Sequence, residues 1–118
     1  METAGEMLEA MLASARPGAP VAAIAAAGVD VVRERGMDDW TYRFGSPGYA
    51  GHGIGCWLDE PPRLRSGAEG LIATGMVLVL EARLGRAGHG GATITDPLVV
   101  TESGVERLSR IPIRTWPR

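Results

Sequence analysis

The uneven distribution of glycine is the feature that most limits how this chain can fold. The sequence contains 17 glycines among 118 residues, and most of them lie between Gly45 and Gly104. Glycine destabilises the interior of helices and permits tight turns and close approaches between backbones. We therefore expect strands and loops in this part of the chain, and helices only before it.

Two apolar patterns with helical spacing precede the glycine-rich part. The first predicts a helix over residues 6–15, which ends at a Pro/Gly turn, and the second predicts a helix over residues 21–35, which ends at Gly36. The residues that share one side are Met7, Leu8, Met11, Leu12 and Ala15 in the first pattern, and Val21, Ile24, Gly28, Val31 and Arg35 in the second. Each helix therefore has one apolar side that must pack against another element.

The following residues, 40–108, have the pattern of a strand-rich region. Alternation of apolar and polar residues is strongest over residues 76–84, and a second long strand is expected over residues 92–101. The shorter predicted segments are strands over residues 40–44, 56–58 and 105–108, loops over residues 45–55 and 62–75, and an extended tail over residues 109–118. Helices followed by strands predict a single α+β domain over residues 1–118, with two helices packed on one face of an antiparallel sheet.

Composition excludes several classes of function. The formal net charge of −2 does not favour binding to nucleic acid or to an anionic membrane. All 12 basic residues are arginine, which excludes a P-loop lysine and a Schiff-base lysine. No apolar run reaches the roughly 18–20 residues of a membrane span, and the N-terminal segment lacks the pattern of a secretory signal. The single cysteine, Cys56, cannot form an internal disulfide, so we expect a reducing, cytoplasmic environment.

Five short motifs in the strand-rich region carry a resemblance to a known family. They are GHGIG at residues 51–55, DEPP at 59–62, GMV at 75–77 with Glu81, GGATITD at 90–96, and VTESG at 100–104. Their order and spacing resemble the pita-bread metallopeptidases, which include methionine aminopeptidases, Xaa-Pro peptidases and creatinase-like enzymes. The resemblance extends from about residue 7 to residue 111. It implies the C-terminal half of a domain that has two similar halves, each with two helices and an antiparallel sheet.

The resemblance implies a role for individual residues. His52 and Glu81 match metal ligands of the family. The family's second histidine, which assists the tetrahedral intermediate, falls at Asp59, its metal-bridging glutamate falls at Thr95, and a neighbouring arginine falls at Thr93. Two further aspartate ligands come from the family's preceding half, and no Asp-rich strand within these 118 residues matches them.

These substitutions predict that the chain holds no dinuclear metal centre. Two neighbouring divalent ions need bridging carboxylates, which a threonine hydroxyl at Thr95 does not replace. One imidazole and one carboxylate, His52 and Glu81, are fewer than the three protein ligands of a usual catalytic site. A carboxylate at Asp59 also repels a developing oxyanion. We therefore expect no cofactor, and at most one weakly bound divalent metal.

Each candidate site residue also has an ordinary structural interpretation. His52 is either a remnant ligand or a turn residue whose ring hydrogen-bonds the backbone. Glu81 faces either a site or a partner such as Arg83 or Arg43, because an unpaired buried carboxylate is costly. His89 is either a surface-loop histidine or a replacement acid/base. Cys56 is interpreted as a small core residue rather than a nucleophile, and core packing is the commoner role for nearby aromatic residues such as Trp57.

Two classes of function follow from the sequence. The first is a degenerate metallopeptidase-like half that binds or transforms a small or peptide-like substrate without a metal, as a hydrolase or lyase. Its candidate catalytic residues are His52, Asp59, Glu81 and His89. The alternative is a non-catalytic binding or assembly module, or a C-terminal fragment that needs a separately encoded N-terminal half. The expected partner is a second copy of the chain or such a half, because the family's halves pack against each other.

Overall fold

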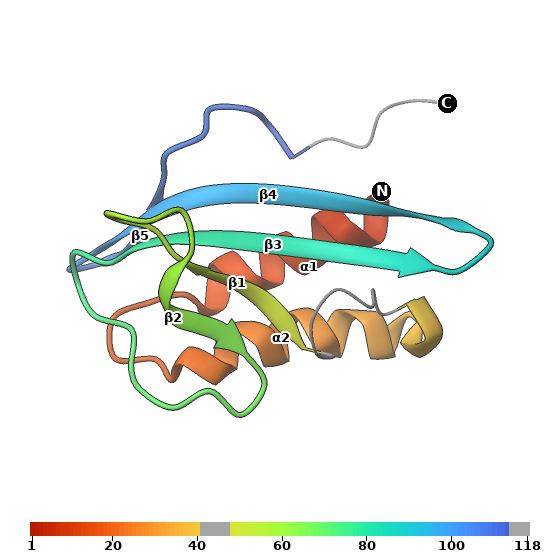
Figure 1. Ribbon diagram of the computed structural model, residues 1–118, viewed down its shortest axis with the longest axis horizontal. Coiled ribbons are helices and arrows are strands. Elements are labelled where there is room, and N and C mark those ends of the chain that lie inside the picture. Colours follow the sequence, from red (N-terminus) through yellow and green to blue (C-terminus); the bar gives the residue numbers. More distant parts are fainter. Residues whose placement is uncertain (41–47, 114–118) are drawn as a thin grey trace.

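The computed structural model describes residues 1–40 and 48–113 (Figure 1). This part of the chain begins with two helices and continues as a set of strands. The elements are α1 (Glu2–Ser14), α2 (Val21–Glu34), a 3₁₀ turn (Asp38–Trp40), β1 (Tyr49–Gly53), β2 (Glu60–Arg65), β3 (Val77–Arg86), β4 (Gly90–Thr101) and β5 (Gly104–Arg107).

The strands form one antiparallel sheet in the order β2-β1-β3-β4-β5. The longest pairing joins β3 to β4, from Val77 opposite Val99 to Arg86 opposite Gly90. Both helices lie against the same side of the sheet, with α1 contacting β3 and β4 and α2 contacting β1 and β2 (Figure 1). This arrangement confirms the predicted α+β fold.

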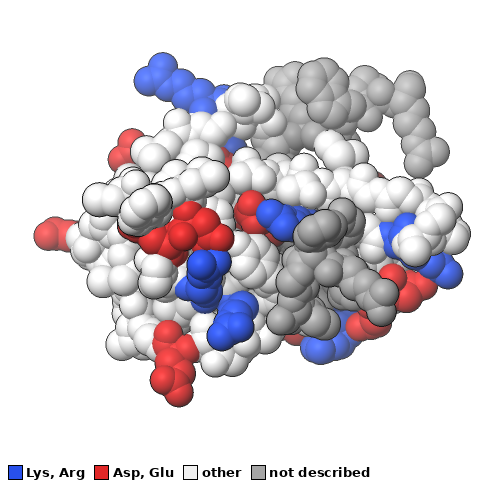
Figure 2. All heavy atoms as spheres, viewed as in Figure 1, with Lys and Arg blue, Asp and Glu red and all other residues white. Residues whose placement is uncertain are grey.

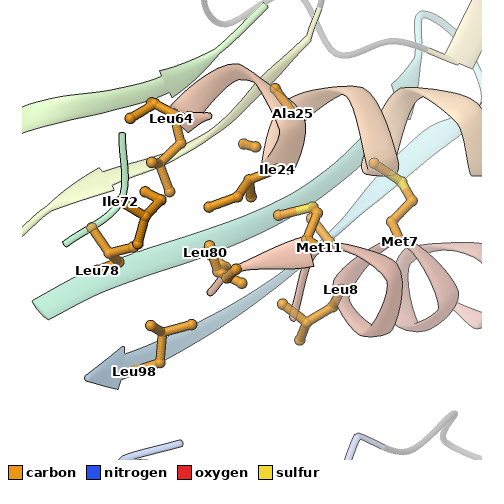
Figure 3. Packing of buried hydrophobic residues seen from close by; sticks show 14 of the residues in the cluster. Met7, Leu8, Met11, Ile24, Ala25, Leu64, Ile72, Leu78, Leu80 and Leu98 are labelled. Carbon is orange, nitrogen blue, oxygen red and sulfur yellow. The ribbon is translucent and has the colours of Figure 1, made fainter. Parts of the chain in front are cut away.

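The core lies between the helices and the sheet. On β3, Leu78, Leu80 and Ala82 are fully buried and point toward the helices, where Figure 3 shows Leu80 close to Leu8 and Met11. Burial of each such leucine stabilises the fold by about 1.5–3 kcal/mol. Because successive strand residues alternate between the two faces, Val79, Glu81 and Arg83 must point away from the helices.

The first helix differs from its prediction at the N-terminal end. It begins at Glu2 rather than at residue 6 and ends at Ser14, and the backbone of Ala15 is extended. The added turn packs with small side chains: Ala4 is fully buried, and a Cβ on Gly5 would lie 3.2 Å from the Ile113 side chain. The helical pattern in the sequence was identified from large apolar residues. It therefore missed this first turn of α1, where the buried residues are small. The second helix ends at Glu34, one residue before the predicted end.

The shorter strands are where sequence prediction was wrong. Residues 56–58 form an exposed bend and not a strand, whereas β1 and the last four residues of β2 lie in segments predicted as loops. Pro61 and Pro62 suggest a loop, but β2 is an edge strand, where a missing backbone donor leaves no partner unsatisfied. Trp40 belongs to the 3₁₀ turn. Residues 41–44 of the first predicted strand and 114–118 of the predicted tail lie outside the described residues.

Among residues 1–40 and 48–113, no helix combines the length and the apolar character needed to cross a membrane.

Candidate functional site

The face of the sheet opposite the helices carries a group of polar side chains, which we call the polar cluster. It consists of Tyr49, His52, Asp59, Arg63, Glu81 and Arg83. The strand register explains the grouping, because Arg63, His52 and Val79 are cross-strand partners in a row, and partners project to the same face. Figure 2 shows red and blue side chains side by side over this region, so neither sign of charge dominates.

His52 lies near the C-terminal end of β1, between two glycines that fix the backbone there. A Cβ on Gly51 would overlap the Val79 carbonyl oxygen, and a Cβ on Gly53 would lie 2.5 Å from the Pro61 carbonyl oxygen. The two flanking strands can therefore approach β1 this closely only because glycine stands at both positions. The Gly-His-Gly motif fixes the backbone that presents the imidazole.

The His52 ring is buried, with a relative exposure of 7%, and its hydrogen bond indicates its tautomer. Nδ1 lies 2.8 Å from the Gly53 carbonyl oxygen. Since a carbonyl only accepts, Nδ1–H is assigned as the donor, and in the neutral ring Nε2 then carries a free lone pair. Of the two interpretations of His52, the ring does hydrogen-bond the backbone, although the residue lies in β1 and not in a turn, and Nε2 remains free to bind a ligand.

Asp59 lies beside His52, at the end of the connection between β1 and β2. Its Oδ1 is 3.9 Å from His52 Nδ1, and its Oδ2 is 2.7 Å from Nη1 of Arg63. The Asp59 side chain is 44% exposed, and the arginine next to it offsets its charge. The structure therefore brings together two of the residues that the sequence singled out, with Arg63 as an unpredicted third.

Glu81 is buried on β3 and has Arg83 as its partner. The carboxylate Oε2 lies 2.6 Å from Arg83 Nη2, at an angle that does not make a hydrogen bond. Neither Oε2 nor Arg83 Nε has a hydrogen-bond partner among the described residues. Of the two partners considered for Glu81, the structure shows Arg83, while Arg43 lies outside the described residues.

Two threonines occupy the positions directly across from this pair on β4. Thr95 is the cross-strand partner of Glu81, and Thr93 is the cross-strand partner of Arg83. Both threonines are exposed. The resemblance assigned a carboxylate to position 95 and an arginine to position 93. Both positions carry neutral hydroxyls instead, across the strand pair from Glu81 and Arg83.

Tyr49 is a member of the polar cluster that sequence analysis missed. The Arg83 guanidinium lies 5.6 Å from the centre of its ring. Burial raises the pKa of the Tyr49 phenol above its ordinary value of 10.0, and the negative charges of Glu81 and Asp59 raise it further. Tyr49 and His52 are three residues apart, which normally places them on opposite faces of a strand. A register shift between Tyr49 and Gly51 interrupts that alternation, and the sequence carries no signal for it.

Comparison with known proteins decides the family. The model of metallopeptidase family M24 matches residues 1–102 of the chain. The chain belongs to this family. Among its relatives, the probable dipeptidase PepE from Mycobacterium tuberculosis is 31% identical over 82% of the chain, and the agropine synthesis cyclase from Rhizobium rhizogenes is 32% identical over 92% of it.

The prolidase structure from Pyrococcus furiosus shares the fold of this M24 chain, with a TM-score of 0.85 over 94% of the chain and 26% identity. The chain covers 32% of that structure, and it spans 24% of PepE and 26% of the cyclase. It thus spans about a quarter of the length of these curated relatives and corresponds to the C-terminal half of the pita-bread domain.

The M24 family implies metal ions, but the polar cluster does not fit a dinuclear centre. Its donors are one imidazole, His52, and two carboxylates that are each paired with an arginine. The position next to Glu81 offers only the hydroxyl of Thr95. Within residues 1–40 and 48–113, no group of three or more His, Cys, Asp or Glu side chains is placed to hold a metal ion.

His89 lies apart from the other candidate site residues of this M24 chain. It is exposed in the turn that joins β3 to β4, beyond Arg86 at the end of β3, and its ring meets the edge of Trp40 with centroids 6.0 Å apart. Its Nδ1 lies 3.2 Å from the Ala87 carbonyl oxygen. The structure therefore groups His52, Asp59 and Glu81 on one face and leaves His89 in a surface loop.

The aromatic and cysteine residues of the β1–β2 connection are not part of the core. Cys56 is exposed, and Trp57 is 75% exposed, so the interpretation of both as core residues is wrong. The backbone of this connection is tied to Glu60, whose Oε2 accepts a hydrogen bond of 3.2 Å from the Trp57 N–H, and a Cβ at Gly55 would displace the Glu60 carboxylate.

Proposed function

We propose that this M24 chain has no dinuclear metallopeptidase activity of its own, and that its polar cluster binds a small polar or peptide-like ligand without a metal. The observation that carries the proposal is the pairing of Glu81 with Arg83 directly across from Thr95. The Glu81 carboxylate is paired with a guanidinium, and the position where two bridged cations would need a second carboxylate carries the Thr95 hydroxyl.

The pair formed by His52 and Asp59 would supply the acid/base chemistry of such a site. Nε2 of His52 is the ring nitrogen left free by the contact of Nδ1 with the Gly53 carbonyl oxygen, and Asp59 Oδ1 lies 3.9 Å from Nδ1 on the other side of the ring. A relative named for a cyclisation, the agropine synthesis cyclase, supports a reaction other than peptide hydrolysis. If the chain is an enzyme, we therefore infer a metal-independent hydrolase or lyase.

Two measurements on the purified chain test the metal half of this proposal. Elemental analysis after gentle purification is expected to show less than one equivalent of manganese, cobalt, iron or zinc per chain. Hydrolysis of the dipeptide Ala-Pro in the presence of MnCl₂ is expected to stay at the level of the buffer. Two equivalents of metal together with Ala-Pro hydrolysis would refute the proposal.

The two histidines of the chain offer a direct test of ligand binding. Their imidazole C–H signals in a proton NMR spectrum are assigned with the variants His52→Gln and His89→Gln. Titration with Ala-Pro is expected to shift the His52 signals and to leave those of His89, the matched control, in place. Equal shifts of both signals, or none, would contradict a ligand site at the polar cluster.

A second candidate function is assembly, and one observation favours it. Trp57 and Leu58 are 75% and 79% exposed in the β1–β2 connection, next to Asp59 of the polar cluster. Neighbouring exposed apolar side chains often mark an interface. The occupant we propose is a second copy of the chain, because closed twofold dimers need only one self-complementary patch. A separately encoded N-terminal-type half is the rival partner.

A further inference from the structure

The charges of the polar cluster balance within the chain. Its two carboxylates, Asp59 and Glu81, each have their own guanidinium, from Arg63 at 2.7 Å and from Arg83 at 2.6 Å. A divalent ion placed among these side chains would therefore add positive charge to a group that is already neutral. The Glu81–Arg83 pair is the more restrictive of the two, because the Glu81 side chain is 11% exposed and the Asp59 side chain is 44% exposed.

Arg83 is held in place from two sides. Glu81 precedes it by two residues on the same face of β3, and the Tyr49 ring lies under its guanidinium. A buried carboxylate without a counter-charge is strongly destabilising, so the folded chain needs a cation at this point. Arg83 is the cation that the described residues provide.

We propose that Arg83 is a built-in counter-ion that takes the place of a metal ion at Glu81 and thereby excludes divalent cations from the polar cluster. The inference deepens the proposed function and rests on its claim that the chain holds no dinuclear metal centre. It adds a specific cause, since the loss of the Arg83 guanidinium leaves the buried Glu81 carboxylate without a counter-charge, which a divalent cation from solution can then supply. A hydroxyl at Thr95 permits this arrangement, whereas a carboxylate there would compete for Arg83.

The test uses Arg83→Met, which keeps an unbranched apolar stem in place of the arginine's and removes the charged guanidinium. The matched control is Arg86→Met on the same strand, whose exposed pair with Asp39 spans 3.2 Å. Thermal unfolding and titration calorimetry are measured with and without MnCl₂. We expect the melting temperature of the wild type and of Arg86→Met not to respond to Mn²⁺. Arg83→Met is expected to melt lower without Mn²⁺, to recover with it, and to bind Mn²⁺ about tenfold or more tightly than the wild type.

Two further variants keep the outcome decisive. Glu81→Gln/Arg83→Met, which removes both charges, is expected to fold and to ignore Mn²⁺. Arg83→Gln, a second neutral side chain, is expected to behave as Arg83→Met does, and it decides the case if Arg83→Met does not fold in either condition. An Arg83→Met or Arg83→Gln variant that folds and binds Mn²⁺ no better than the wild type overturns the role of Arg83 alone. Two equivalents of tightly bound metal in the wild type overturn both this inference and the proposed function.

Discussion

At the scale of single residues, the position of the His52 imidazole in the polar cluster depends on the absence of a side chain at Gly51. The φ of Gly51 is 135°, a conformation that other residues rarely adopt, and its α-carbon faces the Val79 carbonyl oxygen. A side chain there would push β1 away from β3 and displace the neighbouring imidazole. The position of His52 is thus set by close backbone packing.

Gly51→Ala tests this dependence. We expect a loss in the free energy of unfolding of at least about 3 kcal/mol, because backbone strain adds to a steric overlap that only a strand shift can relieve. Gly90→Ala is the matched control, since Gly90 also has a positive φ, of 100°, but a Cβ at this position would have no atom within 4 Å. It should lose only about 1–2 kcal/mol. Equal losses in urea unfolding would show that strain alone governs both sites.

Because of Tyr49, the free energy of unfolding is expected to decrease at alkaline pH. Burial, and then the charges of Glu81 and Asp59, raise the pKa of the phenol in the folded state above 10.0. The protonated phenol therefore contributes stability that is fully present below pH 10 and is lost as the pH rises through the folded pKa. Few other groups titrate in this window, because the chain has no lysine.

We expect Tyr49→Phe to lose less stability than the wild type between pH 9 and pH 11, as measured by urea unfolding. Glu81→Gln should bring the Tyr49 pKa closer to 10.0 in a titration of phenolate absorbance, because one of the charges that raises it is gone. The explanation fails if the two phenols of the wild type titrate together at the ordinary value.

At the scale of elements, the two helices approach each other at Gly28 of α2. A Cβ at this position would lie 3.0 Å from the Met11 sulfur of α1, and Gly28 is buried. Glycine costs a helix about 1 kcal/mol relative to alanine, so its presence here indicates that close helix packing outweighs helix propensity. The close contact lets both helices reach the same face of the sheet.

Gly28→Leu is therefore expected to lower the free energy of unfolding by about 2–3 kcal/mol, because the larger side chain overpacks the contact with Met11. Ala26→Leu places the same side chain on the exposed side of α2 and should change stability by less than about 0.5 kcal/mol. Chemical denaturation followed by circular dichroism distinguishes the two. Similar stabilities for both variants would mean that α1 and α2 can separate without cost.

At the scale of the whole molecule, the helices cover one face of the sheet and the polar cluster occupies the other. Exposed Trp57 and Leu58 lie in the β1–β2 connection, directly before Asp59 of the polar cluster. We expect light scattering to give a mass near twice 12.4 kDa, and the double variant Trp57→Ser/Leu58→Ser to return the chain to a monomer. Leu71→Ser is the matched control, because Leu71 is 61% exposed in another loop. A stable wild-type monomer at high concentration would rule out this assembly.

The amino-acid sequence by itself determined that two helices precede a strand-rich region, and it located the long β3–β4 pair and the residues that carry the family resemblance. Its periodicities report which side of a helix or strand is apolar, and this is local information. It was sufficient to identify His52, Asp59 and Glu81 as candidates and to place Leu78 and Leu80 on the face opposite Glu81.

Only the tertiary structure decided which of these residues meet. The register shift that brings Tyr49 to Arg83, the approach of Val79 to Gly51 and the placement of Thr95 opposite Glu81 all depend on strand pairing between distant segments. Pairing between strands is set by packing over the whole sheet, and a one-residue shift reverses every side chain. The separation of His89 from the polar cluster has the same cause, since the length of the β3–β4 ladder places the turn beyond it.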